Sequence, residues 1–265
     1  MELSITSDYA KDTGDPSAYL RRIADAGFTR VHWCHHWNTD FLYSRHEIDQ
    51  LRQWLSDFGL RILDLHGSVG PEKNWASPHE YRRLAGVELV RNRVEMTAFL
   101  GGRVTILHVP GGPVGEALRR SLDELEKFVA GHGVRIAVEN GDFDTIRQLL
   151  ADYGPDYLGL CYDSGHGNIG GAGGLDNLES LKDRLASVHL HDNDGTADQH
   201  RLPFTGTVDW PRLARAMAAS AYTGCVSMEV GMANSDIEDE TAFLKGAFEA
   251  GVRIAGMIDA VKGEG

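Results

Sequence analysis

Side chains that bind metal ions recur at the ends of the apolar runs of this chain. Each is a histidine, an aspartate or a glutamate, the residue types that hold divalent cations in enzymes. They are His66, His108, Glu139, Asp163, His166, His189, Asp198, His200 and Glu229. Parallel strands of a barrel end together at one mouth, so a series of strands that each present one such side chain can build one metal site. The sequence therefore predicts a metalloenzyme.

The types of these ligands indicate the metal and the chemistry. Oxygen ligands mixed with imidazole, with no thiolate among them, suit Zn, Mn, Co or Mg better than a soft metal. Glu139 and Glu229 come from distant parts of the chain and could flank a substrate and exchange protons with it. A divalent ion beside them would lower their pKa values and polarise a substrate oxygen. This combination predicts proton abstraction next to a carbonyl group.

The elements that must position these residues alternate regularly along the chain. Short apolar runs predict strands at residues 3–7, 29–33, 61–66, 104–108, 135–140, 157–163, 185–189 and 225–230. Amphipathic segments predict helices at 16–26, 45–58, 79–100, 115–131, 144–153, 175–184, 209–219 and 236–256. Gly27 and Gly59 precede strands and are typical of helix ends with positive φ. Alternation of this kind predicts an α/β protein, a single-domain (β/α)8 TIM barrel over residues 1–265.

Composition excludes several classes of function. With 265 residues, 42% hydrophobic and 25% charged, the chain is an ordinary globular protein. Its net charge of −13 makes nucleic acid an unfavourable partner. Cys34, Cys161 and Cys225 lie far apart without a CxxC pair, which indicates a reducing compartment. The first residues lack a signal-peptide pattern and no apolar run could span a bilayer, so we expect a cytoplasmic protein outside the membrane.

The segment after residues 185–189 holds two further features. Alternation places His191 on the same side as His189, where it would be a ligand or the neighbour of one. Residues 192–195, Asp-Asn-Asp-Gly, are typical of a turn.

Taken together, the strand-end motifs resemble those of a known family. The motifs are LHGS, LHVPGG, VEN, YDSGH, VHLHDNDG, DQH with GTVDW, and MEV. In their order and location they are similar to the xylose isomerase-like TIM-barrel superfamily. This superfamily includes sugar phosphate isomerases and epimerases, inosose dehydratase-like enzymes and endonuclease IV-type AP endonucleases. The resemblance covers residues 3–256, nearly the whole chain.

The resemblance implies roles for individual residues. In epimerases of the tagatose 3-epimerase type, one metal ion is held by residues that resemble Glu139, Asp163, His189 and Glu229. The two glutamates act there as acid and base, and a histidine that resembles His166 binds the substrate. Endonuclease IV-type enzymes hold three zinc ions with additional ligands. Their positions resemble His66, His108, His166, Asp198 and His200. We therefore expect one divalent ion, with ligands for up to three.

The leading hypothesis is an enzyme that isomerises, epimerises or dehydrates a small polyhydroxylated substrate. That substrate would be a sugar, a sugar phosphate or an inosose, and the reaction would pass through a metal-stabilised enediolate. Trp33, Trp37, Phe41 and Trp75 in the early loops are expected to cover the apolar face of the sugar, although packing under the loops is the alternative for each. By resemblance, a homo-oligomer is also expected.

Two other classes of function compete with this hypothesis. Zinc-dependent hydrolysis of a phosphodiester would use a metal-bound hydroxide on an abasic site or a small phosphoester. The acidic net charge and the lack of basic loops that would grip DNA disfavour it. A barrel that only binds a ligand would have no use for the complete ligand set, so it is the least favoured of the three.

Overall fold

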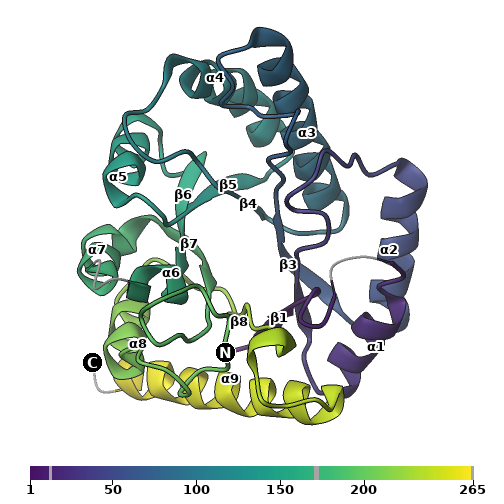
Figure 1. Ribbon diagram of the computed structural model, residues 1–265, viewed down its shortest axis with the longest axis vertical. Coiled ribbons are helices and arrows are strands. Elements are labelled where there is room, and N and C mark those ends of the chain that lie inside the picture. Colours follow the sequence, from purple (N-terminus) through teal and green to yellow (C-terminus); the bar gives the residue numbers. More distant parts are fainter. Residues whose placement is uncertain (12–13, 170–172, 264–265) are drawn as a thin grey trace.

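Eight parallel strands form the centre of the molecule, and helices surround them (Figure 1). The structure is a computed structural model that describes residues 1–11, 14–169 and 173–263. Hydrogen-bonded neighbours follow the order β7-β6-β5-β4-β3-β2-β1-β8. A parallel bridge between Leu190 and Met228 joins the two ends of this series. The sheet is a nearly closed barrel, which confirms the predicted α/β fold, a single-domain (β/α)8 TIM barrel.

The helices and strands alternate along the chain. The strands are β1 (Leu3–Thr6), β2 (Arg30–Trp33), β3 (Arg61–His66), β4 (Val104–Leu107), β5 (Arg135–Glu139), β6 (Leu158–Asp163), β7 (Leu185–His189) and β8 (Val226–Met228). The α-helices are α1 (Ser17–Asp25), α2 (Arg45–Asp57), α3 (Glu80–Phe99), α4 (Glu116–Gly131), α5 (Phe143–Asp152), α6 (Ser164–Asn168), α7 (Gly174–Leu181), α8 (Trp210–Ala218) and α9 (Glu240–Gly263). Two 3-10 helices, η2 (Lys182–Arg184) and η3 (Met232–Asn234), complete the set in the described residues.

Local contacts explain where several helices begin and end. Helix α2 begins with a capping box, in which Ser44 Oγ accepts from Glu47 N at 3.3 Å and the Glu47 carboxylate accepts from Ser44 N at 2.6 Å. Gly27 and Gly59 follow α1 and α2 with φ of 99° and 68°, as predicted for residues that end a helix. These ends fix the length of each helix and therefore the start of the next strand.

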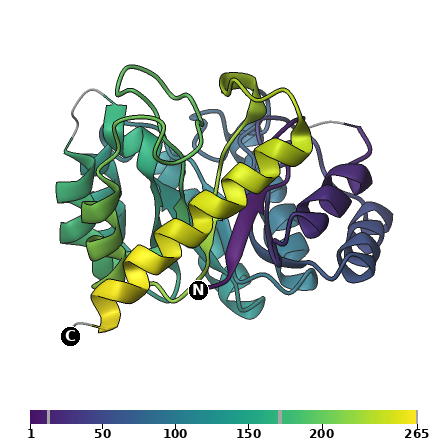
Figure 2. The same ribbon diagram turned by 90° about the horizontal axis from the view of Figure 1, so that it is seen from below.

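The largest differences between the predicted and the observed elements concern α6 and α9. The short helix α6 was not predicted; it begins directly after β6, where the Asp163 side chain caps it by accepting from His166 N at 2.7 Å. The last helix, α9, begins at Glu240 and extends to Gly263, beyond the predicted range 236–256. It crosses the outside of the barrel diagonally (Figure 2).

The interior of the barrel contains a buried polar layer beneath its mouth. His32 on β2 donates from Nδ1 to Asp64 Oδ1 on β3 at 2.7 Å, and Ser187 on β7 donates to Asp64 Oδ2. All three side chains are almost completely buried. Buried polar groups are tolerated when they are hydrogen-bonded, so these contacts hold the three strands in a fixed relation.

The three cysteines are free and buried. Among the described helices, none combines the length and the apolar character that crossing a bilayer requires.

Candidate metal centre and substrate cavity

Four side chains from the carboxyl ends of β5 to β8 meet at the mouth of the barrel. Glu139, Asp163, His189 and Glu229 each place one ligand atom within 4.8 Å of the ligand atoms of the other three. All four are buried. His189 Nδ1 lies 3.2 Å from Glu139 Oε1 and 2.9 Å from Glu229 Oε2. We call these residues the central group; the structure brings together the predicted metal ligands.

The electrostatics of the central group suit a cation. Burial raises the pKa of Glu139 and of Glu229, but the histidines around them, His189 foremost, together outweigh burial and hold both pKa values well below the usual range. Glu139 Oε2 and His189 Nε2 are buried and make no hydrogen bond to the described residues. Three carboxylates crowded around one imidazole, with buried polar atoms left unsatisfied, fit a divalent ion held by oxygen and nitrogen donors.

A second group of ligands lies on one side of the central group. His66 Nε2 and His108 Nε2 lie 3.2 Å and 3.4 Å from Glu139 Oε2. His66 donates from Nδ1 to the backbone carbonyl of Gly67 at 2.9 Å, which leaves its Nε2 directed at Glu139. Glu139 therefore faces two ligand groups, one with each carboxylate oxygen.

A third group lies next to the central group, in the loops after β6 and β7. Asp198 Oδ2 lies 3.3 Å from His166 Nε2 and 3.0 Å from His200 Nε2. His166 and His200 donate from Nδ1 to backbone carbonyl oxygens, at 3.1 Å and 2.8 Å. Burial raises the pKa of Asp198, but these two histidines hold it well below the usual range. His191 joins the group, since its ligand atom lies within 4.8 Å of those of Asp198 and His200.

A cavity of about 290 Å³ opens between the three groups. Glu139, Glu229, His66, His108, His166 and Asp198 line it. The Trp37 ring also lines it, with its centroid 5.0 Å from that of His66 and 5.5 Å from that of His108. Trp37 and His166, for which substrate binding was predicted, therefore line the same cavity.

The structure does not bring Trp33 and Trp75 to this cavity. Trp33 follows the inward-facing His32 on β2, so alternation turns its ring outward, where it stacks on His35 with centroids 4.7 Å apart. Trp75 is 1% exposed; its backbone lies against Gly86 of α3, and its carbonyl oxygen accepts from Ser121 Oγ of α4. Phe41 lies in the same outer region and stacks on His36. Trp33 and Trp75 are buried under the early loops, the alternative considered for them, and Phe41 is not among the residues that line the cavity.

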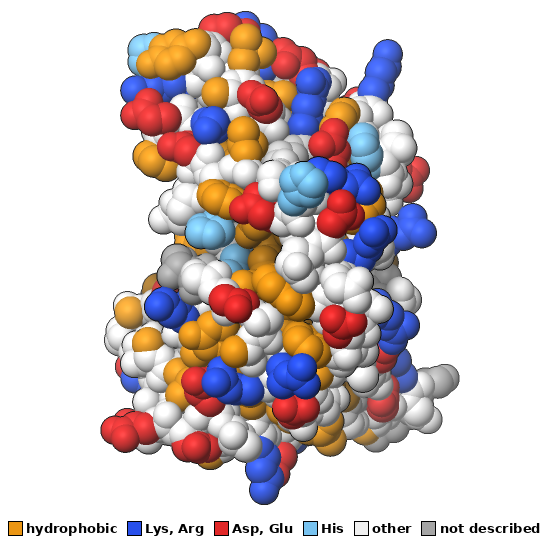
Figure 3. Space-filling view, turned by 90° about the vertical axis from the view of Figure 1, so that its right-hand side faces the viewer, with side chains coloured by type: hydrophobic (Ala, Val, Ile, Leu, Met, Phe, Trp, Pro, Cys, Tyr) orange, Lys and Arg blue, Asp and Glu red, His pale blue; other side chains and the backbone are white. Residues whose placement is uncertain are grey.

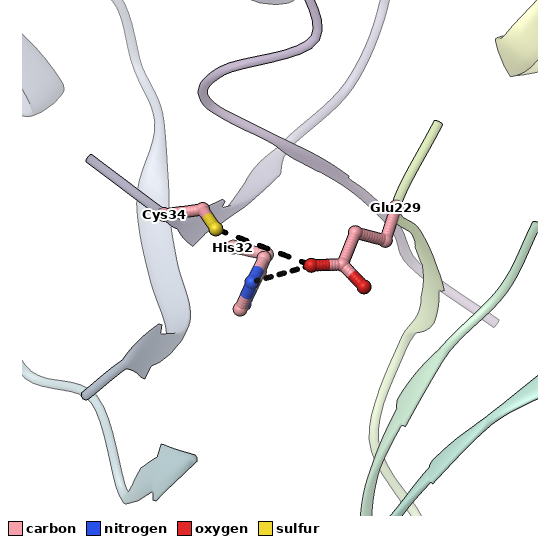
Figure 4. A group of neighbouring side chains, drawn as sticks. All are labelled: His32, Cys34 and Glu229. Atoms are coloured by element: carbon pink, nitrogen blue, oxygen red, sulfur yellow. Dashed lines mark hydrogen bonds and ion pairs between the residues drawn. The ribbon is translucent and has the colours of Figure 1, made fainter. Parts of the chain in front are cut away.

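Sequence reasoning missed three side chains at the mouth, namely Asp8, His32 and Cys34. Asp8 and Cys34 line the cavity, and His32 lies directly beneath it. His32 Nε2 and Cys34 Sγ lie 3.7 Å and 4.0 Å from Glu229 Oε1. Figure 4 marks these two contacts with dashed lines. The alternation of side chains along β2 could have revealed two of them from the sequence. His32 and Cys34 are two residues apart and therefore share the inward face.

The sequence of the chain matches one protein family over most of its length. The model of the xylose isomerase-like TIM barrel matches residues 20–247, and the chain belongs to this family. A relative, the uncharacterized protein y4fM of Sinorhizobium fredii (strain NBRC 101917 / NGR234), is 31% identical over 90% of this chain and 88% of its own. The family predicted from the strand-end motifs is thereby confirmed.

Solved structures with the same fold include sugar epimerases. An L-ribulose 3-epimerase superposes with a TM-score of 0.80 at 17% identity, over 100% of this chain and 97% of its own. A D-tagatose 3-epimerase-like protein superposes with a TM-score of 0.78 at 18% identity, over 100% and 99% of the two chains. At this level of identity the likeness establishes the fold.

Proposed function

We propose that this protein is a divalent-metal-dependent isomerase or epimerase, or a related dehydratase, acting on a small sugar, sugar phosphate or inosose. The observation that carries the proposal is the buried central group, in which two glutamates face one cavity beside a histidine and an aspartate. Membership of the xylose isomerase-like TIM barrel family and the likeness in fold to L-ribulose 3-epimerase support it.

The residues of the central group have distinct roles in this proposal. A divalent ion bound by Glu139, Asp163, His189 and Glu229 would polarise a carbonyl or hydroxyl oxygen of the substrate and neutralise developing negative charge. Glu139 and Glu229 would take and return the proton on the neighbouring carbon. Their lowered pKa values keep both deprotonated at neutral pH, so either can accept that proton.

The cavity supports a small substrate. Its volume of about 290 Å³ is close to the lower end of the range of roughly 300–1,000 Å³ that is usual for small-molecule sites. Imidazoles and carboxylates around it, such as His166 and Asp198, can bind hydroxyl groups. Trp37 offers an aromatic ring to the apolar face of a sugar and would exclude water from it.

The roles of the two glutamates can be tested by proton exchange. Incubation in D2O with a panel of ketoses and inososes would reveal a substrate by deuterium incorporation next to its carbonyl group, measured by NMR. We expect Glu139→Gln and Glu229→Gln, at saturating metal, to slow this exchange by about 10²-fold or more, because each loses a proton-transfer group. Glu249→Gln, on the exposed surface of α9, is the matched control and should exchange normally. Unchanged exchange in both variants would refute the proposed roles.

The two flanking ligand groups favour a second candidate, zinc-dependent hydrolysis of a phosphodiester. His66 and His108 on one side, and Asp198 and His200 on the other, exceed what a one-ion isomerase needs, and several ions in a row can clamp a phosphate. A small phosphoester suits this site better than DNA. The net charge of −13 repels a polyanion such as DNA. On the side of the barrel that α1 and α2 cover, basic side chains are interspersed with acidic ones (Figure 3). Hydrolysis of a chromogenic phosphodiester, without deuterium exchange into any ketose, would favour this candidate.

A further inference from the structure

We propose that His32, Cys34 and Glu229 form an additional metal site, with one imidazole, one thiolate and one carboxylate, that takes a zinc-like ion. The site goes beyond the proposed function and shares only Glu229 with the central group. Figure 4 shows the three side chains converging on one point from β2 and from the end of β8.

The distances between the three donor atoms are close to those of a tetrahedral site. Glu229 Oε1 lies 3.7 Å from His32 Nε2 and 4.0 Å from Cys34 Sγ, and all three atoms lie within 4.8 Å of one another. Zinc bonds of about 2.0 Å to nitrogen and oxygen and about 2.3 Å to sulfur place neighbouring ligand atoms roughly 3.3 to 3.5 Å apart. Small side-chain movements would therefore bring the three donors to bonding distance of one ion.

The orientation of His32 is the second, independent observation. Its Nδ1 donates to Asp64 Oδ1 at 2.7 Å, and Ser187 in turn donates to Asp64. Metal-binding histidines commonly donate their other ring nitrogen to a carboxylate in this way, because the contact fixes the ring and raises its basicity. His32 is 0% exposed, and its Nε2 makes no hydrogen bond to the described residues. This buried nitrogen is directed at Glu229 and Cys34.

Glu229 is placed to serve two ions. Its Oε2 lies 2.9 Å from His189 in the central group, whereas its Oε1 faces His32 and Cys34. Glu139 has the same arrangement on the opposite side, with Oε1 toward His189 and Oε2 toward His66 and His108. Each glutamate can therefore bridge the central ion and one neighbouring ion.

The surroundings of the three donors favour a cation, and a soft one. Cys34, Asp8 and Glu229 line the same cavity, so a water molecule can reach the fourth ligand position. A thiolate ligand selects zinc over magnesium or manganese. Without an ion, the Cys34 thiol would simply donate a hydrogen bond to Glu229.

The experiment uses Co²⁺ as the probe, because a cobalt–thiolate bond gives a charge-transfer absorption in the near ultraviolet. The chelator-treated full chain is titrated with Co²⁺ alone. We expect wild type to develop the band and Cys34→Ser to lack it. Cys161→Ser and Cys225→Ser remove the other two thiols and should keep it. His32→Gln should weaken or abolish it. No band in wild type at any cobalt level, or a band that persists in Cys34→Ser, would overturn the proposal.

The zinc content tests whether the ion at His32, Cys34 and Glu229 is distinct from the ion of the central group. After reconstitution with zinc and desalting, we expect Cys34→Ser to hold one zinc ion fewer per chain than wild type. Equal zinc content with loss of the band would assign the thiolate to the central ion and overturn a separate site.

The Glu139→Gln variant distinguishes a failure of the additional site from a failure of the proposed function. That variant should keep the cobalt band, because Glu139 does not contact Cys34, yet lose deuterium exchange. If wild type gives no band while the glutamate variants still abolish exchange, the additional site fails and the proposed function stands.

Discussion

The buried side chain of Asp192 holds the loop beside the metal centre in place through several hydrogen bonds. Its carboxylate accepts hydrogen bonds from Asn193 N at 3.0 Å, Phe204 N at 2.9 Å, Val208 N at 3.1 Å and Trp210 Nε1 at 2.9 Å. The side chain is 0% exposed. The sequence predicted only a turn here, whereas the structure makes Asp192 the anchor of the loop that carries Asp198 and His200.

Replacing this anchor should cost considerable stability. We expect Asp192→Ala to lower the free energy of unfolding by about 3 kcal/mol, because four donors, most of them buried, lose their acceptor at once. Urea denaturation measures the change. Asp194→Ala in the same loop is the matched control; Asp194 is exposed, so its loss should lower the free energy of unfolding clearly less than the loss of Asp192. Equal effects of the two changes would contradict the anchoring role.

Among the helices, α3 has one very close backbone contact with the loop that precedes it. Gly86 lies in the buried face of this helix, and a Cβ at that position would come within 2.1 Å of the backbone nitrogen of Trp75. The loop before α3 therefore packs directly on the helix backbone. This contact holds Trp75 in the core, away from the cavity where the sequence placed it.

Two glycine-to-alanine changes in helices should have opposite effects. Gly86→Ala should lower the free energy of unfolding by about 2 to 3 kcal/mol, because the added methyl group meets backbone that cannot yield easily. Gly256→Ala in α9 has open space around it and should raise the free energy of unfolding by up to about 1 kcal/mol, through better helix propensity. Denaturant midpoints of the two variants check the prediction, and a stable Gly86→Ala protein would disprove the close approach.

For the whole molecule, ion binding at the mouth should couple to the stability of the barrel. The central group joins the ends of β5, β6, β7 and β8, and its carboxylates lie buried together. An ion that binds only the folded chain, at about 1,000 times its Kd, stabilises it by about 4 kcal/mol. For a chain of this size, that energy corresponds to a shift in Tm on the order of 10 °C.

Chelation should therefore lower the Tm, and added zinc or manganese should restore it. Differential scanning calorimetry with and without EDTA measures the shift. Asp163→Asn weakens the central group and should show a smaller metal-dependent shift than wild type. A Tm that is the same in EDTA and in excess metal would show that no ion stabilises the fold.

The sequence by itself determined the barrel and the ligands at its strand ends. The rhythm of apolar runs and amphipathic segments is local, and helix-ending residues such as Gly27 mark its boundaries. Parallel strands of one barrel end at one mouth, so Glu139, Asp163, His189 and Glu229 could be placed together without knowing their distances.

Only the tertiary structure decided which other side chains reach that mouth. His32 and Trp33 are neighbours in sequence and point to opposite faces of β2. The placement of β2 between its neighbouring strands decides that His32 points into the barrel and Trp33 points outward. The pairing of His32 with Asp64, and the meeting of Cys34 with Glu229, depend on strand register and barrel closure. Both are set by packing over the whole chain, because a shift of one residue reverses every side chain of a strand.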